Sequence, residues 1–332
     1  MRELQSACST AWHVGVVVVL GAVLHPELKA FYHSGHGDMK NTVSAIDTWA
    51  ACLLLWALSL GAGRSTLPKR EKLRWAAPPG IFVFLVITLA TWANFLSYGC
   101  YAAFGPTELV FVYAFARIWH PAERQRPWWH DLPAVLVTAL GSLLCVIGGS
   151  FDASPVAMLA ALLCRACQAL MTVSLRSCCV ALASGSAKEE VGVLEITQWK
   201  LLVTALLCLP YALLTEGLAP WRLLGDREFW FHRSGGLLLG SVLITLGFQC
   251  CTVGLNRGLR SPVAAVLQSA LQPLFGLLLL VLLADGPLRH QLGLKAPTLL
   301  DLVGLGCMLL GVLLTAGTAW RRQSRGERFL QS

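Results

Sequence analysis

Long apolar runs separated by short polar or basic gaps dominate the chain. The clearest run is SPVAAVLQSALQPLFGLLLLVLLAD, from Ser261 to Asp285, which has no charged residue between Pro262 and Ala284. At about 1.5 Å per residue, a helix of this length measures roughly 34 Å, enough to cross a bilayer core about 30 Å thick. The pattern therefore predicts a membrane-spanning helix.

Ten such runs occur, and we expect each to form one span. Their approximate limits are 8–24, 44–62, 76–99, 104–119, 132–150, 155–176, 193–214, 234–255, 261–285 and 299–319. The stretch from Ala76 to Trp119 is divided in two because Gly99 and Gly105-Pro106 mark a tight reversal. Composition agrees with this interpretation: 13% of the residues are charged, against about 25% in soluble domains, and 56% are hydrophobic.

Basic residues cluster in the gaps on one predicted side of the membrane. With both termini in the cytosol, most of the 26 Lys and Arg residues fall in cytosolic segments, as the positive-inside rule expects. The formal net charge of +8 therefore indicates membrane topology rather than a nucleic-acid partner. The twelve cysteines are scattered and lie mostly inside apolar runs, so we expect small apolar side chains there rather than a metal or redox site.

A weak internal repeat links the two halves of the chain. The pattern D-L-x8-G-x-L-L begins at Asp131 and again at Asp301, and Gly105-Pro106 corresponds to Ser261-Pro262. Halves of five spans each have opposite orientations because five is odd, and inverted repeats are typical of transporters. The predicted fold is an all-α membrane protein with ten transmembrane helices in two inverted five-helix repeats, residues 1–151 and 152–320, followed by a basic cytosolic tail, 321–332.

Charged side chains inside predicted spans are the strongest candidates for a binding site. Arg165 lies near the centre of span 155–176, where it shares a face with Gln168, and a buried arginine fork suits an anion. Alternatives are a structural pair with Glu108 or Glu195, or a side chain that snorkels to the surface. Lys200 is either a second cation in the cavity or a snorkelling lysine.

Polar stripes on several other runs extend this candidate site. Glu108, beside the Gly105-Pro106 break, is either a coupling carboxylate or an interfacial one. The predicted substrate-binding residues are Arg165, Lys200, Gln168, Asn94, Tyr98, Gln249, Gln268 and Gln272. The predicted coupling or gating residues are Glu108, Pro106, Pro262 and Pro273.

The run S-P-V-A-A-V-L-Q-S-A-L-Q-P-L-F-G, beginning at Ser261, resembles the penultimate span of the drug/metabolite transporter superfamily, which includes EamA-domain and solute-carrier-35-like proteins. Asp285 after that span and the glycines of the last span, Gly304, Gly306 and Gly311, fit the resemblance. The family pattern usually has Glu where Asp285 stands. The resemblance implies a secondary carrier or exchanger without a bound cofactor, resident in Golgi, endoplasmic-reticulum or plasma membranes.

Two cations against one carboxylate in the central spans favour an anionic substrate, such as a nucleotide sugar or phosphate ester. The alternatives are a carrier of a neutral or cationic metabolite and a non-transporting membrane scaffold. A membrane enzyme is disfavoured because His130-Asp131, at a cytosolic edge, is joined by no second catalytic motif. The expected partners are a small-molecule substrate and the lipid bilayer, and a homodimer is left open.

Overall fold

The computed structural model describes residues 39–61, 70–120, 131–148, 154–184, 191–225, 233–258 and 298–324, and single positions 124, 129, 227 and 230. Within these ranges the chain is helical and forms no strand. The elements are α2 (Lys40–Gly61), α3 (Arg70–Leu96), α4 (Tyr98–Ala103), the 3-10 helix η3 (Gly105–Thr107), α5 (Glu108–Trp119), α7 (Leu132–Gly148), α8 (Pro155–Ser184), α9 (Val193–Glu216), α10 (Ala219–Leu223), α12 (Arg233–Gly258) and α16 (Leu299–Ser324).

The helices follow the apolar runs closely. Every predicted run from the second to the eighth, and the tenth, contains a helix, whereas 8–24 and 261–285 lie outside the described residues. Three helices extend at least five residues beyond the predicted limits. Helix α3 begins at Arg70 and carries Pro78 and Pro79 inside it, α8 continues to Ser184 rather than ending near 176, and α16 continues to Ser324 rather than ending near 319.

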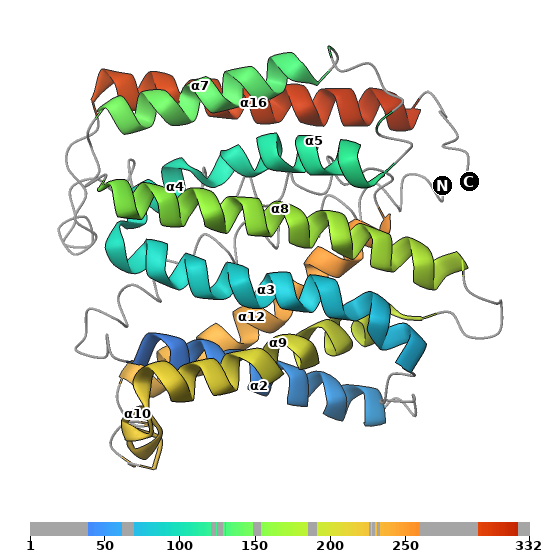
Figure 1. The fold of residues 1–332 in the computed structure, drawn as a ribbon, viewed down its shortest axis with the longest axis vertical. Helices are drawn as coiled ribbons and strands as arrows, with labels where there is room; N and C mark the ends of the chain where they lie inside the picture. Colours follow the sequence, from blue (N-terminus) through green and yellow to red (C-terminus); the bar gives the residue numbers. More distant parts are fainter. Residues whose placement is uncertain are drawn as a thin grey trace.

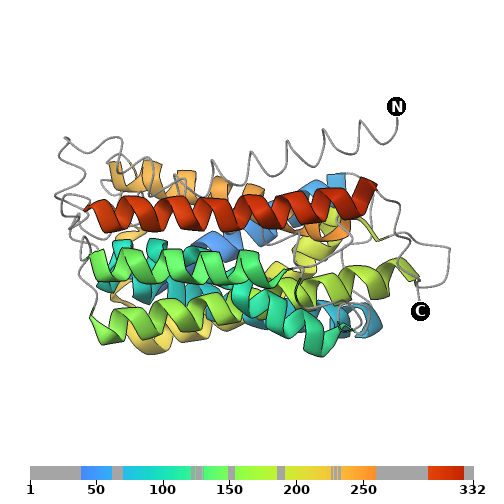
Figure 2. The same ribbon diagram turned by 90° about the horizontal axis from the view of Figure 1, so that it is seen from above.

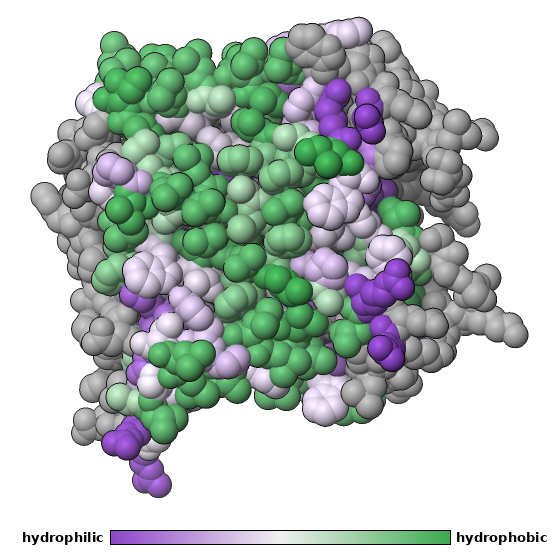
Figure 3. Space-filling model, in the orientation of Figure 1, coloured by the Kyte–Doolittle hydropathy of each residue, from purple (hydrophilic) through white to green (hydrophobic). Residues whose placement is uncertain are grey.

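Five of the described helices are long and apolar enough to cross a membrane: α2, α3, α8, α9 and α12. Helices α7 and α16 carry shorter apolar segments, Leu132–Gly148 and Leu299–Thr315. Large apolar side chains point outward from the bundle, among them Leu214, which is 86% exposed. Figure 3 shows a broad hydrophobic face across the helices, with hydrophilic side chains gathered at its edges. This surface suits lipid, and the chain is an integral membrane protein.

The long helices run along roughly one direction and pack in pairs (Figures 1 and 2). Helix α7 packs against α16, α3 against α8, and α2 against α9, while α12 contacts α2, α8 and α9. Between α3 and α5 the chain reverses through α4 and η3, as the glycines and Pro106 predicted. Side chains from α3, α8, α9 and α12 therefore meet in the interior of the bundle.

Small residues hold α7 and α16 unusually close. A Cβ atom added to Gly141 would lie 2.6 Å from the Gly304 carbonyl oxygen, and one added to Gly304 would lie 2.7 Å from the Gly141 carbonyl oxygen. Gly311 meets Ala134 and Thr138 in the same way, with its added Cβ 2.8 Å from the Ala134 carbonyl oxygen. Small residues at such seams let two backbones approach, which is how helices gain packing energy inside a membrane.

This seam yields a stability prediction. Gly304→Val should separate α7 from α16 and destabilise the protein by about 1–3 kcal/mol, the usual cost of overpacking. The measurement is the thermal unfolding midpoint of the detergent-solubilised protein. Gly306→Val on the same helix is the matched control, because nothing lies within 4 Å of a Cβ added there. Equal midpoints for the two variants would contradict the prediction that close packing at Gly304 stabilises the protein.

Candidate functional site

Five long helices direct polar side chains into the bundle rather than toward lipid. Those side chains that are less than a tenth exposed include Asp47 on α2, Thr91 and Asn94 on α3, Arg165, Gln168 and Thr172 on α8, Thr197, Lys200 and Thr204 on α9, and Ser241, Thr245, Gln249 and Thr252 on α12. Those on α3, α8, α9 and α12 include members of the polar stripes predicted for these runs. Buried polar groups in a membrane bundle need partners within the protein or a bound solute.

One part of this interior is built on a broken helix. Helix α3 ends at Leu96, and the Ser97 side chain caps α4 by accepting a hydrogen bond from the Cys100 backbone nitrogen at 3.2 Å. The next break, Gly105-Pro106, forms η3 and is completely enclosed by the bundle. Pro106 lacks a backbone N–H, so the helix cannot continue its hydrogen-bond ladder here, and backbone carbonyls near the end of α4 become available to other donors.

Arg165 supplies the donor at this break. Its Nη2 donates to the backbone carbonyl of Tyr101 at 3.0 Å, and its Nη1 donates to Gln168 Oε1 at 2.8 Å. The guanidinium also lies 4.1 Å from the centroid of the Tyr101 ring, a favourable cation–π contact. Arg165 is 1% exposed, so the snorkelling alternative is wrong. The Nε atom has no hydrogen-bond partner in the part of the chain that the structure describes.

A chain of polar contacts joins Arg165 to Glu108. The Thr172 hydroxyl lies within hydrogen-bonding distance of both the Gln168 carbonyl, at 3.1 Å, and Glu108 Oε1, at 3.4 Å. Glu108 is fully buried as the first residue of α5, so its carboxylate is enclosed by protein. Glu195, the other suggested partner of Arg165, instead accepts a bond from the Gly192 backbone nitrogen and caps α9.

Lys200 occupies a second buried position. It is 0% exposed, so it does not snorkel, and its Nζ has no hydrogen-bond partner among the described residues. Helix α3 crosses α9 at this point: the Lys200 carbonyl oxygen lies 2.7 Å from a Cβ added to Gly80, and Thr204 Oγ1 donates to the Gly80 carbonyl at 2.9 Å. The backbone of α9 at Lys200 is therefore packed closely against α3.

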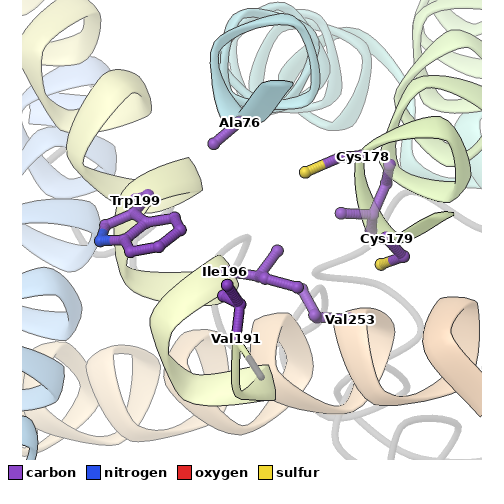
Figure 4. Packing of buried hydrophobic residues seen from close by; sticks show 8 residues of the cluster. Ala76, Cys178, Cys179, Val191, Ile196, Trp199 and Val253 are labelled. Carbon is purple, nitrogen blue, oxygen red and sulfur yellow. The ribbon is translucent and has the colours of Figure 1, made fainter. Parts of the chain in front are cut away.

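The two cations do not share one site. Trp199, the neighbour of Lys200, packs in one cluster with Cys178 and Cys179 of α8 (Figure 4). Cys178 lies thirteen positions after Arg165 on that helix, which corresponds to about 20 Å along its axis. Arg165 and Lys200 therefore lie at different depths in the bundle.

The remaining predicted residues fall into three groups. Asn94 and Gln249 are buried, at 3% and 7% exposure, and Gln249 Oε1 has no hydrogen-bond partner among the described residues. Tyr98 is the first residue of α4. Gln268, Gln272, Pro262 and Pro273 lie outside the described residues, so their predicted roles stay predictions.

Sequence reasoning missed Asp47. This carboxylate is 5% exposed and accepts a hydrogen bond from Ser241 Oγ of α12 at 2.7 Å. Its position near the start of an apolar run made it look like a residue of the span boundary. The signal that could have found it is the polar stripe on α12 that begins with Ser241, because such a stripe calls for a polar partner on a neighbouring helix.

Comparisons with known proteins establish the fold and leave function open. No protein-family model matches the chain, and no curated protein matches it. Among solved structures, 27 chains match. One of them, described only as "Crystal structure of protein", superposes with a TM-score of 0.59 at 18% identity, covering 93% of this chain and 98% of that one. At this identity the likeness shows a shared fold alone.

The contacts of Arg165 predict a structural contribution. Arg165→Ala should lower the free energy of unfolding by about 3 kcal/mol or more, because it removes two charge-assisted hydrogen bonds and leaves the Tyr101 carbonyl without that donor. Thermal unfolding in detergent measures the loss. Arg74→Ala, at an exposed arginine on α3, is the control and should change little. Equal unfolding midpoints for both variants would show that Arg165 does not hold the broken helix.

Proposed function

We propose that this protein is a secondary carrier of a small organic anion, such as a nucleotide sugar or phosphate ester, working by alternating access. In this proposal ten helices form two inverted halves with both termini in the cytosol, in a Golgi, endoplasmic-reticulum or plasma membrane. Substrate binding shifts the population between states open to opposite sides. The protein needs no cofactor for this work.

The observation that carries the proposal is the buried amine of Lys200. An ammonium group removed from water without a partner costs several kcal/mol, and intramembrane charges generally serve a pathway or a ligand. Lys200 is fully enclosed and its Nζ lacks a hydrogen-bond partner in the described ranges. A phosphate or carboxylate group of the substrate would provide the missing partner.

Reciprocal helix contacts support the inverted halves. The repeat aligns Gly141 with Gly311 and Ala134 with Gly304. The close contact between Gly141 and Gly304 then has its counterpart in the contact between Gly311 and Ala134. Likewise α3 packs on α9 while α12 packs on α2, which are equivalent pairs if α3 corresponds to α12 and α2 to α9. A two-fold relation between the halves accounts for both correspondences.

Charge at the helix ends supports the orientation. At one end of the bundle Arg176 donates to the Asn256 carbonyl at 2.6 Å, and Arg257 donates to the Val191 carbonyl at 2.9 Å. At the opposite end of α9, the Glu216 carboxylate accepts bonds from the backbone nitrogens of Asn41 and Thr42, at 2.7 and 2.8 Å. Placing the arginine-rich end in the cytosol follows the positive-inside rule.

The broken helix α4–η3–α5 is a third support. Carriers commonly form their binding sites around interrupted helices, whose free backbone groups and helix ends can interact with solutes. Here the break is flanked by Arg165 and Glu108 and belongs to the proposed first half, while Arg165 lies on α8 of the second half. Rocking of the halves would therefore act directly on this junction.

The proposal predicts that Lys200→Met strongly weakens anion transport while the protein still folds. Losing a bond between a charged amine and an anion costs about 1.5–3 kcal/mol, which corresponds to roughly 10- to 100-fold weaker binding. Counterflow in proteoliposomes measures this, using labelled glucose 6-phosphate and UDP-glucose as anions, leucine as a zwitterion and choline as a cation. Wild-type protein should show trans-stimulated uptake of an anion.

Lys40→Met is the matched control, because Lys40 rests 4.4 Å from the Trp92 and Phe95 rings at the far end of α2. It should retain counterflow. Unchanged anion uptake by Lys200→Met would show that Lys200 does not bind the substrate. Uptake of leucine or choline alone would show that the substrate is zwitterionic or cationic rather than anionic. Absence of uptake for every probe would favour a membrane scaffold.

A further inference from the structure

Asp47 is a buried carboxylate that has no role in the proposed anion site. It lies in the eighth position of α2, about 10 Å along the helix from Lys40 at its start. Its only hydrogen-bond partner in the described part of the chain is the hydroxyl of Ser241, at 2.7 Å. An ionised carboxylate at such a position is costly unless a cation or several donors compensate it.

The Ser241 hydroxyl suits both protonation states of this carboxylate. Ser241 Oγ lies 2.7 Å from Asp47 Oδ1 and 2.9 Å from the Leu238 carbonyl oxygen, yet a hydroxyl has a single hydrogen to donate. When Asp47 is ionised, Ser241 donates to Oδ1. When Oδ1 carries a proton, it can donate to Ser241 Oγ, and the hydroxyl hydrogen rotates to Leu238. No heavy atom has to move between these two arrangements.

The charged and titratable groups around α2 leave Asp47 without a counter-ion. Helix α9 contributes the Cys208 thiol, which packs with Ala45, and Glu216, which binds the first turn of α2 instead. Lys200 lies farther along α9, beside Leu201, which packs with Cys52 and Leu55 rather than with the turn that holds Asp47. None of these side chains makes an ion pair with Asp47.

The other two neighbours of α2 add no charge at this depth. Helix α12 presents Ser241, and its Arg257 lies at the opposite end, where it donates to the Val191 carbonyl. Helix α3 meets this part of α2 through Thr91, whose hydroxyl lies 3.5 Å from that of Ser44. Among the described residues, Asp47 is therefore a solitary carboxylate between hydroxyl and apolar groups.

We propose that Asp47 binds and releases a proton in each transport cycle, so that the carrier is proton-coupled. This inference rests on the proposed function. The Asp47–Ser241 bond joins α2 of the proposed first half to α12 of the second, so rocking of the halves breaks it and opens the carboxylate to one aqueous side. Water there takes or delivers the proton, and the Ser241 hydroxyl turns accordingly. No other bond is made or broken.

Glu108 is the less suitable proton carrier of the two buried carboxylates. It begins α5, where the positive end of the helix dipole stabilises a negative charge, and the Arg165 guanidinium is near enough to attract it. The negative charge of Glu108 is therefore compensated by the helix dipole and by the positive charge of Arg165. Asp47 has neither compensation. Its two alternative hydrogen-bond arrangements allow it to gain or lose a proton without moving a heavy atom.

The first test requires no substrate. Infrared difference spectra of the reconstituted protein, recorded between acid and alkaline pH, should contain the C=O band of a protonated carboxylic acid that is missing in Asp47→Asn. Asparagine keeps the shape and can still bond Ser241, so this variant should fold. Identical spectra for the variant and the wild type would overturn the assignment.

The second test separates coupling from transport. With the membrane potential clamped to zero, one proton moved per substrate allows up to about tenfold accumulation per unit of pH gradient. Wild-type proteoliposomes should accumulate labelled glucose 6-phosphate or UDP-glucose when the gradient has one direction and not when it is reversed. Asp47→Asn should retain counterflow at equal pH on both sides but lose this dependence.

Asp301→Asn is the matched control. Asp301 is another buried carboxylate, but it accepts bonds from the backbone nitrogen and the hydroxyl of Thr298, at 2.7 and 2.6 Å, at the start of α16. This variant should remain coupled. Wild-type counterflow without any gradient dependence would overturn proton coupling and leave the carrier intact. Absence of counterflow in the wild type for both anions would overturn the carrier, and the coupling with it.

Discussion

Much of the interior depends on the bond between Arg165 and the Tyr101 carbonyl. A helix broken inside an apolar bundle exposes backbone groups that water cannot reach, and each unsatisfied group costs several kcal/mol. Gly105-Pro106 creates such a break, and the Arg165 guanidinium of the neighbouring helix α8 donates to the Tyr101 carbonyl beside it. Gln168, Thr172 and Glu108 extend this one contact into a polar junction that ties α4 and α5 to α8.

The α7–α16 seam, where Gly141, Gly304 and Gly311 lie, shows how two helices associate through close packing. Lipid offers apolar side chains the same surroundings as another helix does, so association depends on close packing rather than on escape from water. Gly141, Gly304 and Gly311 supply that closeness, while polar contacts bind the helices on the other side of the bundle. One pair of helices is thus joined by small residues, and the interior beside it by hydrogen bonds.

Three buried charged groups are compensated to different degrees. Arg165 has protein partners for both terminal nitrogens, Asp47 has a single hydroxyl, and the amine of Lys200 has no hydrogen-bond partner among the described residues. The first arrangement fixes structure, while the other two leave room for exchange with a solute or a proton. A carrier needs both kinds, because a rigid framework has to hold sites whose occupancy changes.

The sequence by itself determined the membrane class and most helix limits, because apolar runs of about 20 residues have few other uses. It also found Arg165 and Glu108, since a charge within such a run stands out, and Gln168, which shares a helix face with Arg165. Tertiary structure decided which of these meet. Asp47 pairs with Ser241, nearly two hundred residues away, and Arg165 lies roughly 20 Å from the level of Lys200. Periodicity places a side chain on a face of its own helix, but the depth and partner of that face depend on how helices distant in sequence pack.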